Sequence, residues 1–465
     1  MRRASSLVLL AAGALSQQMV ADPPSTLLAP GATSLPLQLT TSAPSSCRWA
    51  ASDVPYASMP NAFDGAGGVQ HSTTLTGLSG GLQVASVYIN CDAFAAGPPL
   101  VLSYRSLPDS SSAPFPRLGN LWGSGNFRGH PEGLRYAARR SSLWLGSDWT
   151  AAEIAELRSY NEYTVALTSI NACETNDENL PDSFYLTNIT QPASTRGRLQ
   201  SWPGAWRLDL TNPAVQAYQA ALMYCLVVFG GSGYGPNPSC DNATVPPLVF
   251  DGLFVDNVFM DDGAGVNSQD IFHNPFVPIN QTTGKPFADF GEAWKLGMIR
   301  MIEMFRDKMP AAVLDGHAMD INDGNISAQF NAISIGFTTP EIVERRQSFA
   351  EGFQMYESWM TVPARSPKLT MVESAVRFMF GYGYGFVRNL SEASPIRLAQ
   401  HSLTHPLPSS IFAPPFGRTT TSASSSRTTA RTATRFRALP CPASATRARR
   451  RRRRPRPATF FRRRS

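Results

Sequence analysis

The 465-residue chain is poor in charge and in histidine, and it holds no long apolar segment beyond its amino terminus. Only 16% of the residues are charged, and the 6 histidines are scattered along the chain. No HExxH motif, paired CxxC motif or Walker A loop occurs, so neither a zinc site nor a P-loop is indicated. No later segment offers the roughly 18 consecutive apolar residues of a membrane-spanning helix. We therefore expect no metal, no organic cofactor and no transmembrane segment.

Charge is unevenly distributed along the chain. Residues 393–465 contain 17 arginines and no Asp, Glu or Lys, and subtracting these 17 charges from the formal +7 leaves −10 for the rest. The sequence pI of about 9.2 thus describes the tail and not the acidic body of the protein. We draw no nucleic-acid partner from the bulk charge.

The amino terminus has the pattern of a secretory signal. Met1-Arg2-Arg3 is followed by an apolar run over residues 7–15 and then by small and polar residues. This charged region and short apolar region are too short to span a bilayer and are typical of a signal peptide. We predict a signal peptide over residues 1–21, removed near residues 16–21, and a secreted or cell-surface protein.

Cysteines and glycosylation motifs fit that compartment. In an oxidising environment the 6 cysteines are disulfide candidates. The expected pairs are Cys47 with Cys91 and Cys225 with Cys240, while Cys173 and Cys441 stay unassigned. A chain of this size contains several Asn-x-Ser/Thr sequons by chance, and here they lie at Asn188, Asn242, Asn280, Asn325 and Asn389.

The region 25–107 is rich in Ser, Thr, Gly and Pro and contains short alternating runs such as LPLQLTT and LQVASVYINCD. Period-2 alternation broken by turn residues predicts a small antiparallel β-sandwich. Cys47 and Cys91 would meet across its core. The pattern resembles a fibronectin type III or immunoglobulin-like module, although Trp49 follows the first Cys too closely to lie on a separate strand.

A Ser- and Pro-rich linker is expected over residues 108–119, before a second domain over residues 120–388. From residue 141, short apolar runs alternate with helical ones, which is typical of a parallel sheet built from βα units. The predicted strands are SSLWLG, YTVALTSI, AWRLDL, DGLFVDNV, AAVLDGHA, AISIGF and KLTMVES. Seven strands are one short of a (β/α)8 barrel, so the predicted fold is a TIM barrel that is incomplete at its C-terminal end.

Four helical segments are predicted between these strands. They are TAAEIAELRSY, NPAVQAYQAALMYCLVVF, FGEAWKLGMIRMIEMFRDKM and PEIVERRQSFAEGFQMYESWM. The third has the clearest pattern, because apolar residues recur at helical spacing on one face. Those residues are expected in the core: Trp294, Met298, Met301, Ile302 and Phe305.

The tail over residues 389–465 consists mainly of Ser, Thr, Ala, Pro and Arg. Such a composition buries little apolar surface and predicts disorder. One interpretation is a tail that binds polyanions or anionic membranes. The other is a shifted reading frame, which is favoured because every acid and Lys disappears where the strand pattern ends.

A family resemblance emerges from residues 141–388. The segment AWRLDLTNPAVQAY is followed by FDGLFVDNV, then by a long helix ending in FRDKMP, and then by the strand AAVLDGHA. This order of segments resembles the glycoside-hydrolase-like TIM-barrel proteins. The resemblance implies a TIM barrel and a carbohydrate substrate, and it is weaker for the reaction than for the fold.

Two acids flank the strand DGLFVDNV. In a parallel barrel the active site lies at the carboxyl-terminal edge of the strands. Asp251 starts the strand, where a turn or a bond to the backbone is expected, whereas Asp256 ends it and would point into the pocket. Glycoside hydrolysis needs two carboxyl groups, one as proton donor and one as nucleophile or base. By analogy with retaining hydrolases of this fold, Asp256 is the candidate nucleophile, and its alternative role is to cap the next turn.

Glu341, just past the sixth predicted strand, is the candidate general acid, although TPEIVERR also has the pattern of a helix start. Asp209 ends the third predicted strand and either faces the pocket or holds the turn before Pro213. The remaining candidates for sugar binding are Asn257, Asp315, His317, Glu373 and Trp206. Trp149, Trp206 and Tyr185 are aromatic residues that could stack on a sugar face or simply pack in the core.

The leading hypothesis is a secreted hydrolase of O-glycosidic bonds that uses two carboxylates at the carboxyl-terminal rim of the barrel. The alternative is a non-catalytic carbohydrate-binding or cell-surface protein with a degenerate barrel, since a missing eighth strand exposes two sheet edges. The sugar, the stereochemical course and the oligomeric state are not readable from the sequence.

Overall fold

The computed structural model describes most of the chain between residues 19 and 372. The described residues are 19–78, 81–109, 118–121, 130–146, 149–186, 204–231, 233, 246–258, 279–280, 283–317, 323–335, 354, 357–367 and 369–372. The Arg-rich tail, the predicted signal peptide up to residue 18 and most of the predicted linker therefore lie outside the described residues. In the described ranges, no helix is both long and apolar enough to cross a membrane.

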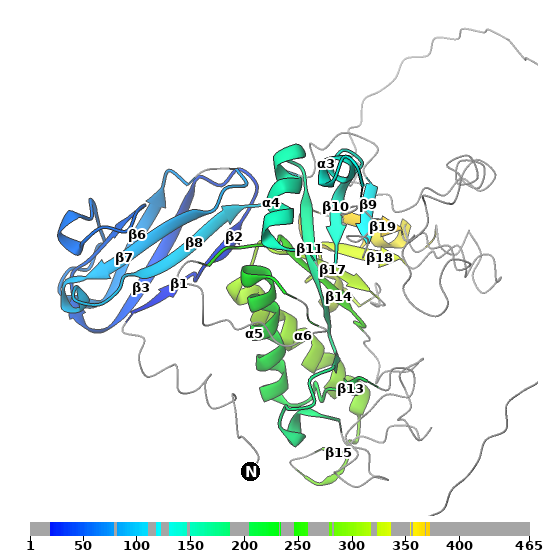
Figure 1. The fold of residues 1–465 in the computed structure, drawn as a ribbon. Coiled ribbons are helices and arrows are strands. Elements are labelled where there is room, and N and C mark those ends of the chain that lie inside the picture. Colours follow the sequence, from blue (N-terminus) through cyan, green and yellow to red (C-terminus); the bar gives the residue numbers. More distant parts are fainter. Residues whose placement is uncertain are drawn as a thin grey trace, which may run out of the picture. The chain divides into compact units, whose positions relative to one another are not determined.

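The amino-terminal part, here called the β module (residues 19–107), contains two sheets (Figure 1). A three-stranded antiparallel sheet has the order β1 (Met19–Asp22), β3 (Ser34–Ser45) and β6 (Gly68–Thr76). A five-stranded sheet has the order β2 (Thr26–Leu28), β8 (Leu100–Ser106), β7 (Ala85–Cys91), β4 (Cys47–Ala50) and β5 (Asn61–Ala62). Strand β2 pairs in parallel with β8, so the second sheet is mixed and not purely antiparallel as predicted.

Alternating residues of both sheets form one apolar cluster in the β module. Leu37 and Leu39 of β3 meet Val87 and Ile89 of β7 in it. The predicted Cys47–Cys91 disulfide is present. It joins directly opposed residues of neighbouring strands β4 and β7, so it lies within one sheet and does not cross the core as predicted. The assignment to a fibronectin type III or immunoglobulin-like family stays a prediction.

The second part holds a parallel sheet of seven strands, a topology compatible with an incomplete barrel. Its order is β9 (Leu118–Leu121), β10 (Ser141–Leu145), β11 (Val165–Asn171), β14 (Gly252–Asp256), β17 (Val313–His317), β18 (Ala332–Ile335) and β19 (Leu369–Val372). Every neighbouring pair is parallel. The region after residue 372, where the sequence predicts that an eighth strand is missing, lies outside the described residues.

Two strand assignments need correction. Residues 118–119, predicted as the end of a linker, belong to strand β9 of this sheet. The segment AWRLDL does not join it, because β13 (Trp206–Arg207) pairs antiparallel with β12 (Glu174–Thr175) in a small separate sheet. A parallel pairing needs a crossover connection, and the described residues between β11 and β13 contain no α-helix to provide one.

The described helices begin where the local sequence predicts. Helix α4 (Ala151–Tyr160) has a capping box between Thr150 and Glu153. Helix α5 (Pro213–Phe229) has Asn212 as its N-cap and proline at its first position. Helix α6 (Phe290–Lys308) buries the predicted apolar face in the core of the barrel. Shorter elements are α3 (Leu134–Ala138), α7 (Gly324–Ser327), β15 (Ile279–Asn280), β16 (Lys285–Pro286) and the 3-10 turns Tyr56–Ser58, Asp92–Phe94 and Asp182–Phe184.

The β module is bonded to the barrel through buried contacts. Leu27 and Leu107 of the β module belong to the same apolar cluster as α5 and α6. Thr26 Oγ1 donates to the Lys308 carbonyl at 3.0 Å, and Tyr224 Oη donates to the Ser25 carbonyl at 3.0 Å. The two parts therefore share a core at this junction.

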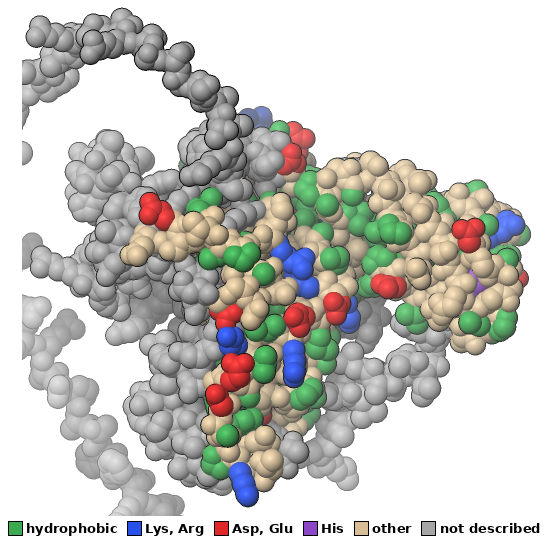
Figure 2. All heavy atoms as spheres, turned by 180° about the vertical axis from the view of Figure 1, so that it is seen from behind, with side chains coloured by type: hydrophobic (Ala, Val, Ile, Leu, Met, Phe, Trp, Pro, Cys, Tyr) green, Lys and Arg blue, Asp and Glu red, His purple; other side chains and the backbone are tan. Residues whose placement is uncertain are grey.

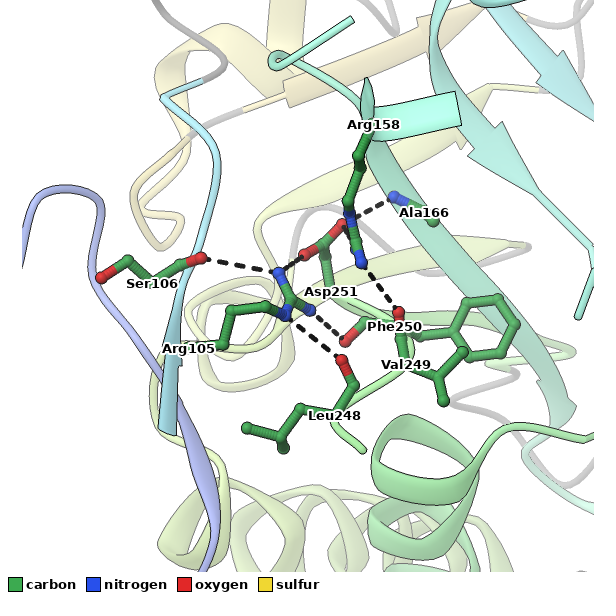
Figure 3. Close-up of polar contacts among 8 residues, drawn as sticks. All are labelled: Arg105, Ser106, Arg158, Ala166, Leu248, Val249, Phe250 and Asp251. Carbon is green, nitrogen blue, oxygen red and sulfur yellow. Dashed lines mark hydrogen bonds and ion pairs between the residues drawn. The ribbon is translucent and has the colours of Figure 1, made fainter. Parts of the chain in front are cut away.

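A buried ion-pair network, here called the Asp251 network, completes the junction (Figure 3). Asp251 Oδ1 lies 2.6 Å from Arg105 Nη1 of β8, and its Oδ2 lies 2.7 Å from Arg158 Nη2 of α4. Oδ2 also accepts a hydrogen bond from the Ala166 amide at 2.8 Å. The predicted backbone bond is confirmed, whereas the contacts with the two arginines were not predicted. Burial alone raises the pKa of Asp251, but Arg105 and Arg158 together with the amide hold it below its usual value.

The surface seen in Figure 2 mixes charges of both signs. Acidic and basic side chains are interspersed over this face, and apolar side chains lie in small groups among them. The exposed large apolar residues of the described chain are Val20, Val69, Val84, Tyr160, Leu296 and Met304. Nothing on this face indicates a polyanion-binding surface in the described part of the protein.

Candidate active site

The carboxyl ends of four neighbouring strands bring polar side chains into one row. Asn171 ends β11 and pairs in register with Asp256, which ends β14. Val255 pairs with Gly316, so the next residues, Asp256 and His317, also face each other. His317 in turn pairs with Ser334 of β18. Because residues in register on adjacent strands point to the same face, this row forms a polar edge along the carboxyl end of the sheet.

Asp256 and His317 form the central pair of this row. Asp256 Oδ1 lies 2.6 Å from His317 Nδ1 and accepts a second hydrogen bond from the Asn257 amide at 2.9 Å. When Asp256 is ionised its carboxylate only accepts, and Nδ1 is then the donor in this contact. The Asp256 side chain is 13% exposed and that of His317 is 21% exposed, so both are reachable from solvent. The His317 ring also stacks on Phe254, which fixes its orientation.

Asn257 contributes through its backbone. It has a positive φ of 57°, a conformation that Asn tolerates better than most residues, and the chain turns sharply after Asp256. Its carbonyl accepts a hydrogen bond from Cys173 Sγ at 3.6 Å. The turn therefore ends the strand at Asp256, and the Asn257 amide that it presents holds the Asp256 carboxylate.

A second acidic residue, which the sequence did not single out, lies beside this row. Glu174 of β12 accepts a hydrogen bond from Asn171 Nδ2 at 2.9 Å and is only 6% exposed. Its register partner in the antiparallel pair is Arg207, which is fully buried and lies over the Trp294 ring. The sequence signal that could have found Glu174 is its position, three residues after Asn171 and just past a buried strand. Acids at the carboxyl ends of strands are candidates for the rim of the barrel.

Cys173 lies between these groups as a buried free thiol. Its Sγ is 3.9 Å from Arg207 Nη2. Burial raises the pKa of the Cys173 thiol to about 12, with Arg207 lowering the pKa and Glu174 and Asp256 raising it. The thiol is therefore protonated at neutral pH and is not a nucleophile there. Cys225, unlike Cys173, is disulfide-bonded, and its predicted partner Cys240 lies outside the described residues.

Two other predicted acids are buried within the fold. Asp209 does not end a strand of the parallel sheet, and its Oδ1 accepts hydrogen bonds from the Thr211 amide and from Thr211 Oγ1 at 3.1 and 2.6 Å. It thus holds the turn before α5, which is the structural alternative that the sequence offered. Asp315 is fully buried, and its Oδ2 accepts from Ser334 Oγ at 2.7 Å. It lies below the rim, beside Phe254.

The aromatic candidates are core residues. Trp149 packs edge-on against Trp144 and is 3% exposed. Tyr185 is fully buried and donates its hydroxyl to the Asp177 carbonyl at 2.6 Å. Trp206, at 8% exposed, packs near Tyr185. None of the three presents an open ring face in the described structure, and Glu341 and Glu373 lie outside the described residues.

Within the described part of the chain, no three His, Cys, Asp or Glu side chains gather in a way that would hold a metal ion. The arrangement at the rim is instead a partly exposed carboxylate bonded to an imidazole, with a second, more deeply placed carboxyl group one strand away. Carboxyl groups in such positions can exchange protons with a substrate or attack it directly.

No protein-family model matches the chain, and no curated protein matches it. Several solved structures resemble it at low identity. Three of them are the glycoside hydrolase domain of PelA from Pseudomonas aeruginosa (10% identity, TM-score 0.26, 47% of this chain and 66% of that chain), xylanase XynB from Paenibacillus barcinonensis (11%, 0.25, 58% and 70%), and a bacterial Ig-like domain containing GH10 xylanase from termite gut (12%, 0.24, 75% and 78%). The chain spans just under two thirds of the PelA domain. At TM-scores this low, these likenesses carry no further inference about fold or reaction.

Proposed function

We propose that the protein is a secreted glycoside hydrolase that cleaves O-glycosidic bonds in a polysaccharide or glycan. The observation that carries the proposal is the placement of Asp256. Its carboxylate stands at the carboxyl end of a parallel strand, is partly exposed, and is oriented by His317 at 2.6 Å. In parallel barrels this edge is where catalytic groups are found.

The proposed chemistry assigns Asp256 the role of nucleophile or water-activating base. A second carboxyl group must protonate the leaving oxygen, and the sequence put forward Glu341 for that role. His317 and the Asn257 amide both bond Asp256 Oδ1, and these bonds hold the carboxylate in one orientation, as either role requires. Water is the only co-substrate in this scheme.

The experiment is to assay the full chain and Asp256→Asn on a panel of polysaccharides and aryl glycosides. Wild type should release reducing sugar or phenol from at least one member, and Asp256→Asn should reduce kcat by at least about 10³-fold, because the carboxylate acts on the reacting carbon or on water. The matched control is Asp307→Asn, which changes an exposed carboxylate on α6 and should leave kcat unchanged.

Two results would contradict the proposal. Full activity in Asp256→Asn would show that the carboxylate is not catalytic. Binding of a glycan without cleavage, equal in wild type and Asp256→Asn, would instead identify a non-catalytic carbohydrate-binding protein. Circular dichroism spectra of both variants check that the loss of activity is not a loss of folding.

A further inference from the structure

Glu174 is the strongest unassigned group in the described structure, because it links directly to the row that contains Asp256. Its Oε2 accepts from Asn171 Nδ2 at 2.9 Å. Asn171 is in turn the register partner of Asp256 on the neighbouring strand, where backbones lie about 4.8 Å apart. Asn171 therefore bonds Glu174 through its side chain and lies beside Asp256 through its backbone register. Its own conformation is fixed by the Cys173 amide, which donates to Asn171 Oδ1 at 3.1 Å.

The other described acids of this region have structural roles that exclude them. Asp209 holds the turn before α5 through Thr211, and Asp315 is fully buried below the rim, where Ser334 bonds it. Glu174 differs from both, since the amide that holds it belongs to a strand end of the polar row. Among the described residues it is thus the acid best placed to act together with Asp256.

The backbone supports this position from two sides. Gln219 of α5 donates to the carbonyls of Asn171 and Ala172, both at 3.2 Å. The Ala172 amide bonds the Asp256 carbonyl at 2.8 Å, so the strand pairing extends one residue beyond Asn171. The segment that leads to Glu174 is therefore anchored both to a helix and to the strand that carries Asp256.

Electrostatics at Cys173 agree with that geometry. The thiol precedes Glu174 in the chain and donates to the carbonyl of Asn257, the residue after Asp256, at 3.6 Å, and both acids raise its pKa. Glu174 and Arg207 are register partners on β12 and β13 and both are buried, which accounts for the place of Glu174 in the small sheet. This pairing does not explain why Glu174 is bonded to the residue beside Asp256.

We propose that Glu174 is the second carboxyl group of the active site and donates the proton to the leaving oxygen. This inference rests on the proposed glycoside hydrolysis. As the bond from the anomeric carbon to the leaving oxygen breaks, its electron pair goes to that oxygen, which takes the proton of the Glu174 carboxyl. Water then supplies hydroxide to the anomeric carbon, directly or after a glycosyl-Asp256 intermediate, and its remaining proton restores the carboxyl group.

The test uses leaving groups of different basicity. A 2,4-dinitrophenolate departs without protonation, whereas an unsubstituted phenolate needs a proton donor. The 2,4-dinitrophenyl and phenyl glycosides of a sugar that wild type cleaves are assayed with Glu174→Gln. Loss of a general acid should lower the rate on the phenyl glycoside by about 10²–10⁴-fold and the rate on the dinitrophenyl glycoside by less than about 10-fold. Glu303→Gln, an exposed acid of α6, is the matched control.

Three other results would contradict the role of Glu174 or the proposed function. An equal loss on both glycosides in Glu174→Gln would assign it a structural role and end this inference, while hydrolysis by Asp256 would stand. The same dependence on the leaving group in Glu341→Gln, and not in Glu174→Gln, would move the proton donor to Glu341. Absence of any hydrolysis by wild type would remove the proposed function itself. If Glu174→Gln fails to fold, Asn171→Ser is tested instead, because it removes the hydrogen bond that positions Glu174. Its rate should also fall more on the phenyl glycoside than on the dinitrophenyl glycoside, by a smaller factor.

Discussion

The two ends of strand β14 carry the same residue type in opposite environments. At the amino end, Asp251 is fully buried and bonded to Arg105 and Arg158. At the carboxyl end, Asp256 is partly exposed and bonded to His317. The first carboxylate has two strong cationic partners and belongs to the junction with the β module. The second is bonded by an imidazole and a backbone amide, and it is partly exposed to solvent.

This difference shows why an acid at a strand end is a weak signal by itself. Both aspartates flank the same run of apolar residues, so the local sequence treats them alike. What separates them is the direction of the strand in a parallel sheet and the partners that arrive from distant segments. Arg105 comes from a strand of the β module, whereas His317 comes from the next strand of the barrel sheet.

The largest expected effect on stability is at the amino end. Asp251→Asn keeps the shape of the side chain but leaves Arg105 and Arg158 without their counter-ion. Breaking a buried pair in this way should cost about 3–5 kcal/mol in the free energy of unfolding. Urea unfolding monitored by circular dichroism measures the loss.

The control for that change is an exposed ion pair. Arg139 and Glu132 lie 3.5 Å apart with both side chains more than half exposed, and Arg139→Ala should change stability by no more than about 1 kcal/mol. If Asp251→Asn costs as little as Arg139→Ala, the buried network does not stabilise the junction.

The next effect is on catalysis and lies at the carboxyl end. His317→Gln removes the imidazole that orients Asp256 and should lower kcat by about 10²-fold, since misplacing a reacting group has a cost of that order. Its free energy of unfolding should change much less than that of Asp251→Asn, because the site is partly open. A kcat equal to that of wild type would mean that His317 does not act on Asp256.

The smallest effect is the pH dependence of stability contributed by Asp251. Its pKa in the folded protein lies below the ordinary 3.8, so the unfolded chain takes up a proton first as the pH falls. The stabilising contribution is therefore complete above the unfolded pKa and is lost as the pH drops through the folded one. The difference in unfolding free energy between wild type and Asp251→Asn should narrow between about pH 5 and pH 3. A difference that stays constant over this range for Asp251→Asn would contradict the assignment.

The sequence predicted three of its four helices and most strands of the parallel sheet correctly because their signals are local, while most of the fourth, PEIVERRQSFAEGFQMYESWM, lies outside the described residues. Apolar spacing on one face predicted α6. The prediction for AWRLDL was wrong. Its residues alternate as in a strand, but a strand joins a parallel sheet only through a crossover connection, and β13 pairs antiparallel with β12 instead. The strand at residues 118–121 was not predicted either, because four residues beside a Ser/Pro-rich stretch are too few to show an alternating apolar pattern.

At the candidate site, the sequence placed Asp256 and His317 at strand ends but could not show that they touch. That contact depends on the register between β14 and β17. The sequence did not predict Glu174 as a site residue, because its partner Asn171 is a common polar residue. Only the pairing of Asn171 with Asp256 on the neighbouring strand connects Glu174 with the site. Trp149 and Tyr185 illustrate the reverse, since an aromatic residue near a strand end has the same pattern whether it faces solvent or the core.

The shared core at Leu27 and Leu107 has a practical consequence for dissecting the chain. An expression fragment that starts after residue 107 would retain every strand of the parallel sheet, yet it would strip apolar surface from α5 and α6 and delete the guanidinium that neutralises Asp251. Such a fragment should be insoluble or partly unfolded. The two parts are better treated as one cooperative folding unit than as separable modules on a tether.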